Sequence, residues 1–178
     1  GAGELARPEL GEILAASMSD NDLDAGRVQV ELKETLLMRQ PRAGGILAEL
    51  ERLGVAIVID NFGMGHSSFL RLAEFPVSAI KIDRHFVQGM PAERRSADVC
   101  AAIIAAAQQL GFRVIAQGVE TDLQLEQLRG MCCDEAQGFL YTQPVPSAEV
   151  VAFLKEFRTD GASGAAPVPI RSVQRGTG

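Results

Sequence analysis

Polar side chains stand at the ends of five apolar segments of the chain. In chain order they are Glu31, Asp60 with Asn61, Lys81 with Asp83, Gln117 with Glu120, and Gln137. A single acid at such a place is often a turn residue or a helix cap, but recurrence at five successive segments favours a shared site. Carboxylates and amides are oxygen ligands for Mg²⁺ or Mn²⁺, and a lysine stabilises negative charge. These residue types are therefore suited to a divalent metal and a phosphate ester.

The segments that end in these residues are predicted to be strands that alternate with helices. Apolar periodicity predicts strands at 28–32, 55–60, 77–83, 112–118 and 136–140, and helices at 8–20, 43–54, 67–75, 96–110, 122–130 and 147–157. Five strands that are each followed by a helix predict a parallel α/β sheet. The carboxyl ends of parallel strands share one edge of the sheet, so the polar residues are expected to meet there.

Composition argues against two classes of partner. The chain has 178 residues, of which 47% are hydrophobic and 22% are charged, as in an ordinary soluble globular domain. With 17 Lys and Arg residues and a net charge of -6, it lacks the basic surface typical of proteins that bind nucleic acid polymers. The longest apolar run, 99–107, is far shorter than the roughly 20 residues of a membrane span, so no span is expected.

The three cysteines, Cys100, Cys132 and Cys133, lack the spacing of a metal or redox site. We expect all three to be small buried apolar residues in a reducing compartment. They receive no functional role.

The composition changes after Phe157, where the chain becomes rich in Gly, Ala, Pro and Ser. That segment has too little apolar surface to offset the entropy cost of ordering. We therefore expect one domain over residues 1–157 and a flexible tail over residues 158–178. Because the chain begins with Gly instead of Met, we also expect it to be a piece of a longer protein.

The motifs at the strand ends resemble those of the EAL domain, the bacterial phosphodiesterase that opens cyclic di-GMP to the linear dinucleotide. The family pattern of an "ELTE"-like strand end, "DDFGTGYSS", "KID", "AEGVE" and "QGY" before a proline has counterparts here in "ELKE", "DNFGMGHSS", "KID", "AQGVE" and "QGFLYTQP". Order and spacing agree over roughly residues 7–154. The resemblance implies a TIM-like (β/α) barrel in which two divalent metals, Mg²⁺ or Mn²⁺, activate a water for attack on a phosphodiester.

The resemblance also implies roles and partners. By matched position it implies metal ligands at Glu31, Asp60 and Asn61, catalytic residues at Lys81 and Gln117, anchors of the loop after Asp60 at Glu34 and Glu120, and substrate-side residues at Asp83 and Gln137. That loop, residues 62–68, is similar to the one that couples the family's dimer interface to its active site. The implied partners are cyclic di-GMP and a second copy or another protein. The implied location is the bacterial cytoplasm, or the cytoplasmic part of a larger signalling protein.

Three departures from the family pattern indicate a degenerate site. Amides replace the family's acids at Asn61 and Gln117, which keeps the side-chain size and removes the charge. The Glu-Ala-Leu strand and the strand with the family's asparagine ligand are expected before residue 1, so we expect about five of the barrel's eight units here. We predict a cyclic di-GMP signalling domain that is catalytically impaired and acts in nucleotide sensing or partner regulation. The alternative is an active metal-dependent phosphodiesterase whose N-terminal segment lies outside this chain.

Some of these residues also have plainer interpretations. His66 and His85 have no acid or cysteine at ligand spacing and are expected in loop or packing roles. Asp83 is also a candidate helix cap, and Gln137 can satisfy backbone groups at the barrel rim. A flavodoxin-like receiver domain is a further alternative suggested by "IVID" and "KID", but the later motifs argue against it. The strand at 28–32 is expected to be an exposed edge, paired with another chain or covered by the first helix.

Overall fold

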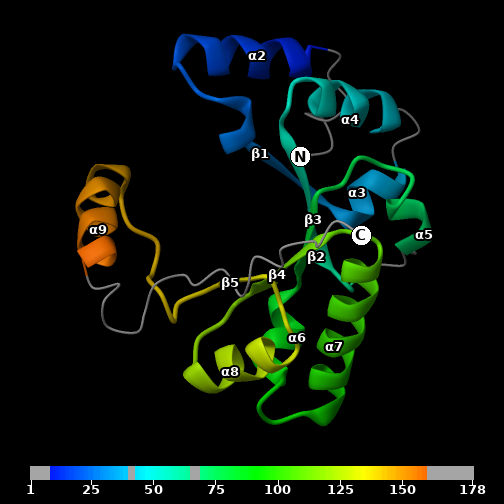
Figure 1. Cartoon of the computed structure of the whole chain (residues 1–178), viewed down its shortest axis with the longest axis vertical. Helices are drawn as coiled ribbons and strands as arrows, with labels where there is room; N and C mark the ends of the chain where they lie inside the picture. Colours follow the sequence, from blue (N-terminus) through cyan, green and yellow to red (C-terminus); the bar gives the residue numbers. More distant parts are fainter. Residues whose placement is uncertain (1–8, 40–42, 65–68, 160–178) are drawn as a thin grey trace, which may run out of the picture.

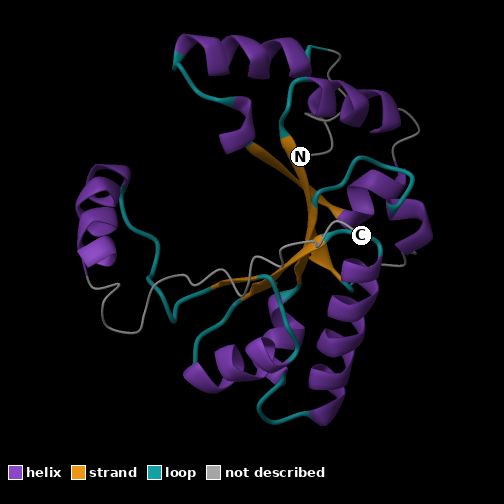
Figure 2. Cartoon of the chain, viewed as in Figure 1, coloured by secondary structure: helices purple, strands orange, loops and turns teal. Residues whose placement is uncertain are grey.

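The fold centres on one parallel sheet of five strands in the order β1-β2-β3-β4-β5. We describe it from a computed structural model that covers residues 9–39, 43–64 and 69–159. The strands are β1 Gln29–Lys33, β2 Ala56–Phe62, β3 Ala79–Ile82, β4 Arg113–Gln117 and β5 Glu135–Gln137. Figure 2 shows them as a twisted central sheet with helices around it. Every neighbouring pair is parallel, which confirms the predicted parallel α/β class.

Helices connect the strands and extend the chain at both ends (Figure 1). They are α2 Leu10–Asp20, the 3₁₀ turn η1 Ala25–Arg27, α3 Glu34–Arg39, α4 Ala43–Arg52, α5 Phe69–Leu72, α6 Arg84–Gly89, α7 Arg94–Gln109, α8 Asp122–Gly130 and α9 Ser147–Thr159. Five strands with crossover helices make an incomplete TIM-like barrel, since a complete barrel has eight strands. Across the described residues, none of the helices combines the length and the apolar character needed to cross a membrane.

Most helix boundaries lie within a few residues of the sequence predictions, although α5 ends at Leu72 and not at 75, and η1, α3 and α6 are additions. α8 has the predicted bounds and opens with a capping box, in which the Thr121 side chain accepts a hydrogen bond from the Gln124 backbone. α7 ends at Gln109, and Gly111 follows with a φ of 83°, which only glycine adopts easily. The short helices α3 and α6 were not predicted, because six residues are too few for a helical period to be read.

One face of the sheet packs against the helices and forms the main core. Because side chains alternate along a strand, this face takes every second strand residue. The strand residues include Ile57, Ile59, Ile80, Ile82 and Val114, and the helix residues include Leu47, Leu50, Leu72, Ile104 and Leu128. Each of these side chains is at most 1% exposed, so this core carries much of the apolar burial of the fold.

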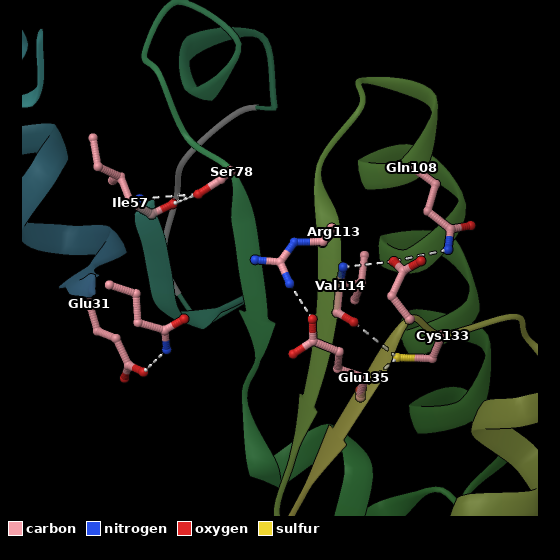
Figure 3. Close-up of polar contacts among 10 residues, drawn as sticks. Glu31, Ile57, Ser78, Gln108, Arg113, Val114, Cys133 and Glu135 are labelled. Carbon is pink, nitrogen blue, oxygen red and sulfur yellow. Dashed lines mark hydrogen bonds and ion pairs between the residues drawn. The ribbon is translucent and has the colours of Figure 1, made fainter. Parts of the chain in front are cut away.

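The opposite face of the sheet carries the polar residues that the sequence singled out. A second, small buried cluster lies there, made of Val58, Ala79 and Ile115. Two positions further along the same three strands, and hence on the same face, stand Asp60, Lys81 and Gln117. A thin apolar layer therefore supports a polar layer at the carboxyl ends of the strands. An ion pair between Arg113 and Glu135 joins β4 to β5 (Figure 3).

The cysteines differ in exposure. Cys100 and Cys133 are buried as predicted, and burial raises the pKa of their thiols to about 11 and about 12. Cys132 is exposed, so the prediction of burial is wrong for this residue. It lies in the turn after α8 with a φ of 58°, while Cys133 lies against β4 and its thiol donates to the Val114 carbonyl oxygen at 3.5 Å (Figure 3). The turn thus directs the two neighbouring side chains into different surroundings.

Ser78 links the start of β3 to β2 (Figure 3). Its hydroxyl donates to the Ile57 carbonyl oxygen at 2.8 Å and accepts from the Ile57 amide at 3.1 Å. We expect Ser78→Ala to lower the free energy of unfolding by about 1–3 kcal/mol, because a buried backbone N–H loses its acceptor. Urea unfolding measures this change. Ser19→Ala, at an exposed position of α2, is the control, and an equal loss in both variants would contradict the expectation.

Thiol reactivity should separate the three cysteines. At pH 8 we expect one thiol, that of Cys132, to react rapidly with a disulfide reagent in the folded protein. Burial blocks access to Cys100 and Cys133, and their raised pKa values leave almost no thiolate at that pH. All three should react once the chain is unfolded in guanidinium chloride. Rapid reaction of three thiols before unfolding would disprove this assignment.

Candidate active site

The polar layer is organised around the buried ammonium of Lys81. The Lys81 side chain is 6% exposed, and its Nζ forms an ion pair with the Glu31 carboxylate, which is 37% exposed. Gln29, two residues before Glu31 on β1, donates a second hydrogen bond to the same Glu31 oxygen at 3.0 Å (Figure 3). A buried charge is tolerated when it is paired and hydrogen-bonded, so Glu31 compensates Lys81.

A second contact joins Asp60 to Gln117. The Gln117 Nε2 donates to Asp60 Oδ1 at 2.9 Å. Both contacts connect strands that are not neighbours: Glu31 and Lys81 reach across β2, and Asp60 and Gln117 reach across β3. The sheet therefore curves inward on this face, as the wall of a barrel does, and brings side chains from alternate strands together. These four residues carry two carboxylates and one ammonium, a net charge of -1.

Asn61 takes a different direction from Asp60. It is exposed, has a φ of 55°, and donates from Nδ2 to Asp83 Oδ2 at 2.7 Å. Asp83 is 7% exposed and caps α6, where its Oδ1 accepts from the His85 backbone at 2.8 Å. The interpretation of Asp83 as a helix cap is thus confirmed, and its substrate-side role stays a prediction. The Asn61 side chain is therefore hydrogen-bonded to the helix cap Asp83 and not to the predicted metal ligand Asp60.

The two predicted loop anchors have different surroundings. Glu34 is 3% exposed, and its Oε2 accepts from the Gly63 backbone at 3.2 Å, at the start of the loop after β2. This contact suits the predicted anchoring role. Glu120 is exposed and accepts from Gln88 Nε2 of α6 at 2.7 Å. An anchoring role for Glu120 stays a prediction.

The remaining candidates lie at the rim of the site or beyond it. Gln137 ends β5 with an exposed side chain, and its carbonyl oxygen accepts from the Val119 backbone at 3.1 Å. His85 is exposed and lies edge-on to the Phe86 ring, as expected for a packing residue. His66 falls in 65–68, outside the residues that the structure describes, as do positions 160–178 of the predicted tail.

The donor set fits one divalent cation better than two. Glu31 and Asp60 supply carboxylates from adjacent strands, and Mg²⁺ is commonly held by one or two carboxylates with water and substrate phosphate. Each carboxylate already accepts hydrogen bonds from protein nitrogen, which compensates its charge without a metal. No group of three His, Cys, Asp or Glu side chains within the described ranges is arranged to hold a metal ion.

Sequence reasoning did not include two residues that touch the predicted site residues. Gln29 contacts Glu31, and its position two residues earlier on a predicted strand places it on the same face, which is a usable signal. Gln88 contacts Glu120 from α6. No signal pointed to Gln88, because α6 itself was not predicted and the two residues lie 32 positions apart.

An incomplete parallel α/β barrel with acids, amides and a buried lysine at the carboxyl ends of its strands defines the class of protein. The chain belongs to the EAL domain family, whose model matches residues 2–144. The resemblance inferred from the strand-end motifs is thereby confirmed.

Relatives of known name support the same membership. The cyclic di-GMP phosphodiesterases NbdA and RocR of Pseudomonas aeruginosa are each 38% identical to the chain, over 175 and 144 residues. These matches cover 98% and 80% of this chain, but only 22% and 37% of the two relatives. The chain therefore spans well under half the length of these proteins.

Solved structures show the same fold. The phosphodiesterase PaMucR in its c-di-GMP complex superposes with a TM-score of 0.80 and 33% identity, over 84% of this chain and 61% of that chain. The manganese and cyclic di-GMP complex of Klebsiella pneumoniae BlrP1 gives a TM-score of 0.74 and 27% identity, over 79% of this chain and 36% of that chain. The incomplete barrel thus matches part of a larger fold.

The ion pair of Glu31 with Lys81 should respond unequally to loss of either partner. We expect Glu31→Ala to lower the free energy of unfolding by about 3 kcal/mol, because it leaves a buried ammonium unpaired. Lys81→Met should cost less, about 1 kcal/mol, because the Glu31 carboxylate is partly exposed and water can solvate it. Thermal and urea unfolding would measure both.

Asp98→Ala is the control for this pair. Asp98 lies near Arg94 on the surface of α7 at 3.8 Å, and both side chains are largely exposed, so little change is expected. A larger loss from Lys81→Met than from Glu31→Ala would show that packing of the lysine stem, and not its charge, dominates at this position.

Proposed function

We propose that this EAL domain binds cyclic di-GMP, hydrolyses it poorly or not at all, and acts in nucleotide sensing or in regulation of a protein partner. The observation that carries the proposal is the hydrogen bond from Gln117 Nε2 to Asp60 Oδ1. A predicted metal ligand is here satisfied by an amide of its own chain. The proposal concerns the domain of residues 1–157 in the bacterial cytoplasm, alone or as part of a larger signalling protein.

The effect of Gln117 follows from simple electrostatics. A glutamate at this position would place a second carboxylate against Asp60, and two like charges about 4 Å apart repel by roughly 4 kcal/mol at an effective dielectric of about 20. A cation between the two carboxylates would remove that repulsion. The amide of Gln117 instead supplies its own N–H donor. The local requirement for a cation is therefore weaker.

Glu31 and Asp60 would hold the one Mg²⁺ or Mn²⁺ ion that this donor set fits. A bound divalent ion supplies charge for an activated water and for a phosphate oxygen. Hydrolysis through two ions would need further charge, and the amide at Asn61 does not provide it. Lys81, whose ammonium pairs with Glu31 on the site face, supplies a positive charge for a phosphate of the bound nucleotide.

Retained residues support binding without hydrolysis. Two of the solved structures similar to this chain are complexes with cyclic di-GMP, and both share its fold. Glu31, Asp60 and Lys81 keep their charges here and lie on three adjacent strands, with Glu31 midway along β1 and the other two near the carboxyl ends of β2 and β3. A second copy of the chain or another protein is the proposed recipient of the signal.

An active phosphodiesterase is the second candidate function. The same three charged residues favour it, since one divalent ion and a positioned lysine retain part of the family's catalytic charge. Fold membership does not decide between the two candidates, because function depends on the site and not on the architecture.

The double change Asn61→Asp with Gln117→Glu should separate these candidates. In the complete natural protein that contains these residues, we expect the parent to bind cyclic di-GMP with little turnover in Mg²⁺ or Mn²⁺. The double variant should gain orders of magnitude in rate, since each ~1.4 kcal/mol of transition-state stabilisation is worth tenfold. Product formation can be followed by chromatography, with binding measured by calorimetry.

Ser19→Ala serves as the control protein in the same assay, since the residue lies on the exposed side of α2. Equal turnover by the parent and the double variant at a substantial rate would assign this protein to the active phosphodiesterases. Failure of both proteins to bind the nucleotide would refute the sensing role.

A further inference from the structure

A β-bulge stands at the carboxyl end of β2, directly at the site. The register of β2 against β3 shifts between Ile59 and Phe62, so that Asp60 and Asn61 of β2 oppose Lys81 alone on β3. Such a bulge changes the direction of the side chains that follow it. Asn61 occupies the left-handed region with a φ of 55°, which Asn and Asp adopt more readily than other side chains with a Cβ. An asparagine at position 61 is therefore explained by the backbone conformation of the bulge as well as by a role as metal ligand.

The side chain of Asn61 is held by α6. Its Nδ2 donates to Asp83 Oδ2 at 2.7 Å, and the other oxygen of that carboxylate accepts from the His85 backbone. Asp83 is 7% exposed, so it needs both donors to compensate its burial. An aspartate at position 61 has no N–H to donate and would place a second negative charge against this buried carboxylate.

The next residues of the loop also rest on α6. A Cβ placed on Gly63 would lie 2.9 Å from Phe86 Cε2, which is closer than side chains tolerate. On the other side of the site, a Cβ on Gly118 would lie 2.6 Å from the Arg84 Cβ. The helix α6 thus lies in close contact with the chain that follows Asp60 and with the chain that follows Gln117.

We propose that Asn61 is a positioning residue which ties the β2 bulge to the cap of α6 and so holds Asp60 in reach of Gln117. The side-chain amides of Gln117 and Asn61 then have different roles. Gln117 replaces charge directly at Asp60, whereas Asn61 is kept for its donor and its backbone conformation. The role given to Gln117 rests on the proposed function, whereas the role given to Asn61 does not.

Exchange of the two side chains gives a direct test of the pair. Asn61→Asp alone should lower the equilibrium constant for folding about thirtyfold, because two carboxylates then meet. The exchange Asn61→Asp with Asp83→Asn should restore it to within about threefold, because the donor and acceptor are only reversed and asparagine also caps helices well. Asn21→Asp is the matched control. Asn21 donates to the Ser17 carbonyl oxygen at an exposed helix end, and a loss of about fivefold or less is expected.

A spectroscopic signal reports whether Asp60 moves. Asn61→Gly keeps the bulge conformation and removes the hydrogen bond to Asp83. In this variant the side-chain amide resonances of Gln117 in ¹⁵N-labelled protein should shift toward those of an exposed glutamine, and they should stay in place in the exchanged pair. The resonances are assigned by their loss in Gln117→Glu. The Asn61 signals are simple to identify, because Asn21 is the other asparagine of the chain.

Mn²⁺ affinity of the 178-residue chain, measured by electron paramagnetic resonance, completes the test. Gln117→Glu should raise the affinity about tenfold or more, and Asn61→Asp by less than about threefold. The positioning role is overturned if Asn61→Asp is as stable as the parent and binds Mn²⁺ as tightly as Gln117→Glu, or if Asn61→Gly leaves the Gln117 signals unchanged. If Gln117→Glu leaves the affinity unchanged, the proposed loss of charge fails, and the stability and resonance data still decide the role of Asn61.

Discussion

The buried ammonium of Lys81 is the constraint on which the arrangement of the site depends. An ammonium that is 6% exposed within the sheet requires a nearby negative charge, and Glu31 provides it from β1 across the intervening strand β2. Val58 lies opposite Glu31 in the register, so a compact apolar side chain, not a polar one, stands beneath the ion pair. β1 is an edge strand of the sheet, and the ion pair of Glu31 with Lys81 helps to hold it in register.

A second contact between strands that are not neighbours lies one strand further on in the sheet. Asp60 and Gln117 meet across β3. Alternate strands contribute to one layer only when the sheet curves, so the curvature of an incomplete barrel and the proximity of the polar groups have one geometric cause. The helix α6 then holds the carboxyl ends of both β2 and β4. It contacts β2 through its cap residue Asp83, and it packs closely against Gly118 after β4.

An amide in place of an acid has a different effect at each of the two positions. At Gln117 the amide nitrogen points at a carboxylate of the site, which changes the charge seen by a ligand. At Asn61 the amide nitrogen points at a helix cap, which changes the support of the strand end. Membership in the EAL family is the same in either case. The chemistry of this domain therefore depends on where each nitrogen is directed, and a motif alone does not contain that information.

The sequence by itself determined the parallel α/β class, the succession of the five strands along the chain, the bounds of α8 and the gathering of polar residues at one sheet edge. These features depend on local periodicity, on caps such as Thr121 and on the direction of parallel strands, and each can be read along the chain. Only the tertiary structure decided that Lys81 pairs with Glu31, that Gln117 donates to Asp60, and that Asn61 turns to Asp83. Those contacts join residues 22 to 57 positions apart and depend on sheet curvature and on a bulge of one residue. The exposure of Cys132 and the presence of α6 were likewise beyond the sequence, because a single turn and a six-residue helix have no period from which they could be predicted.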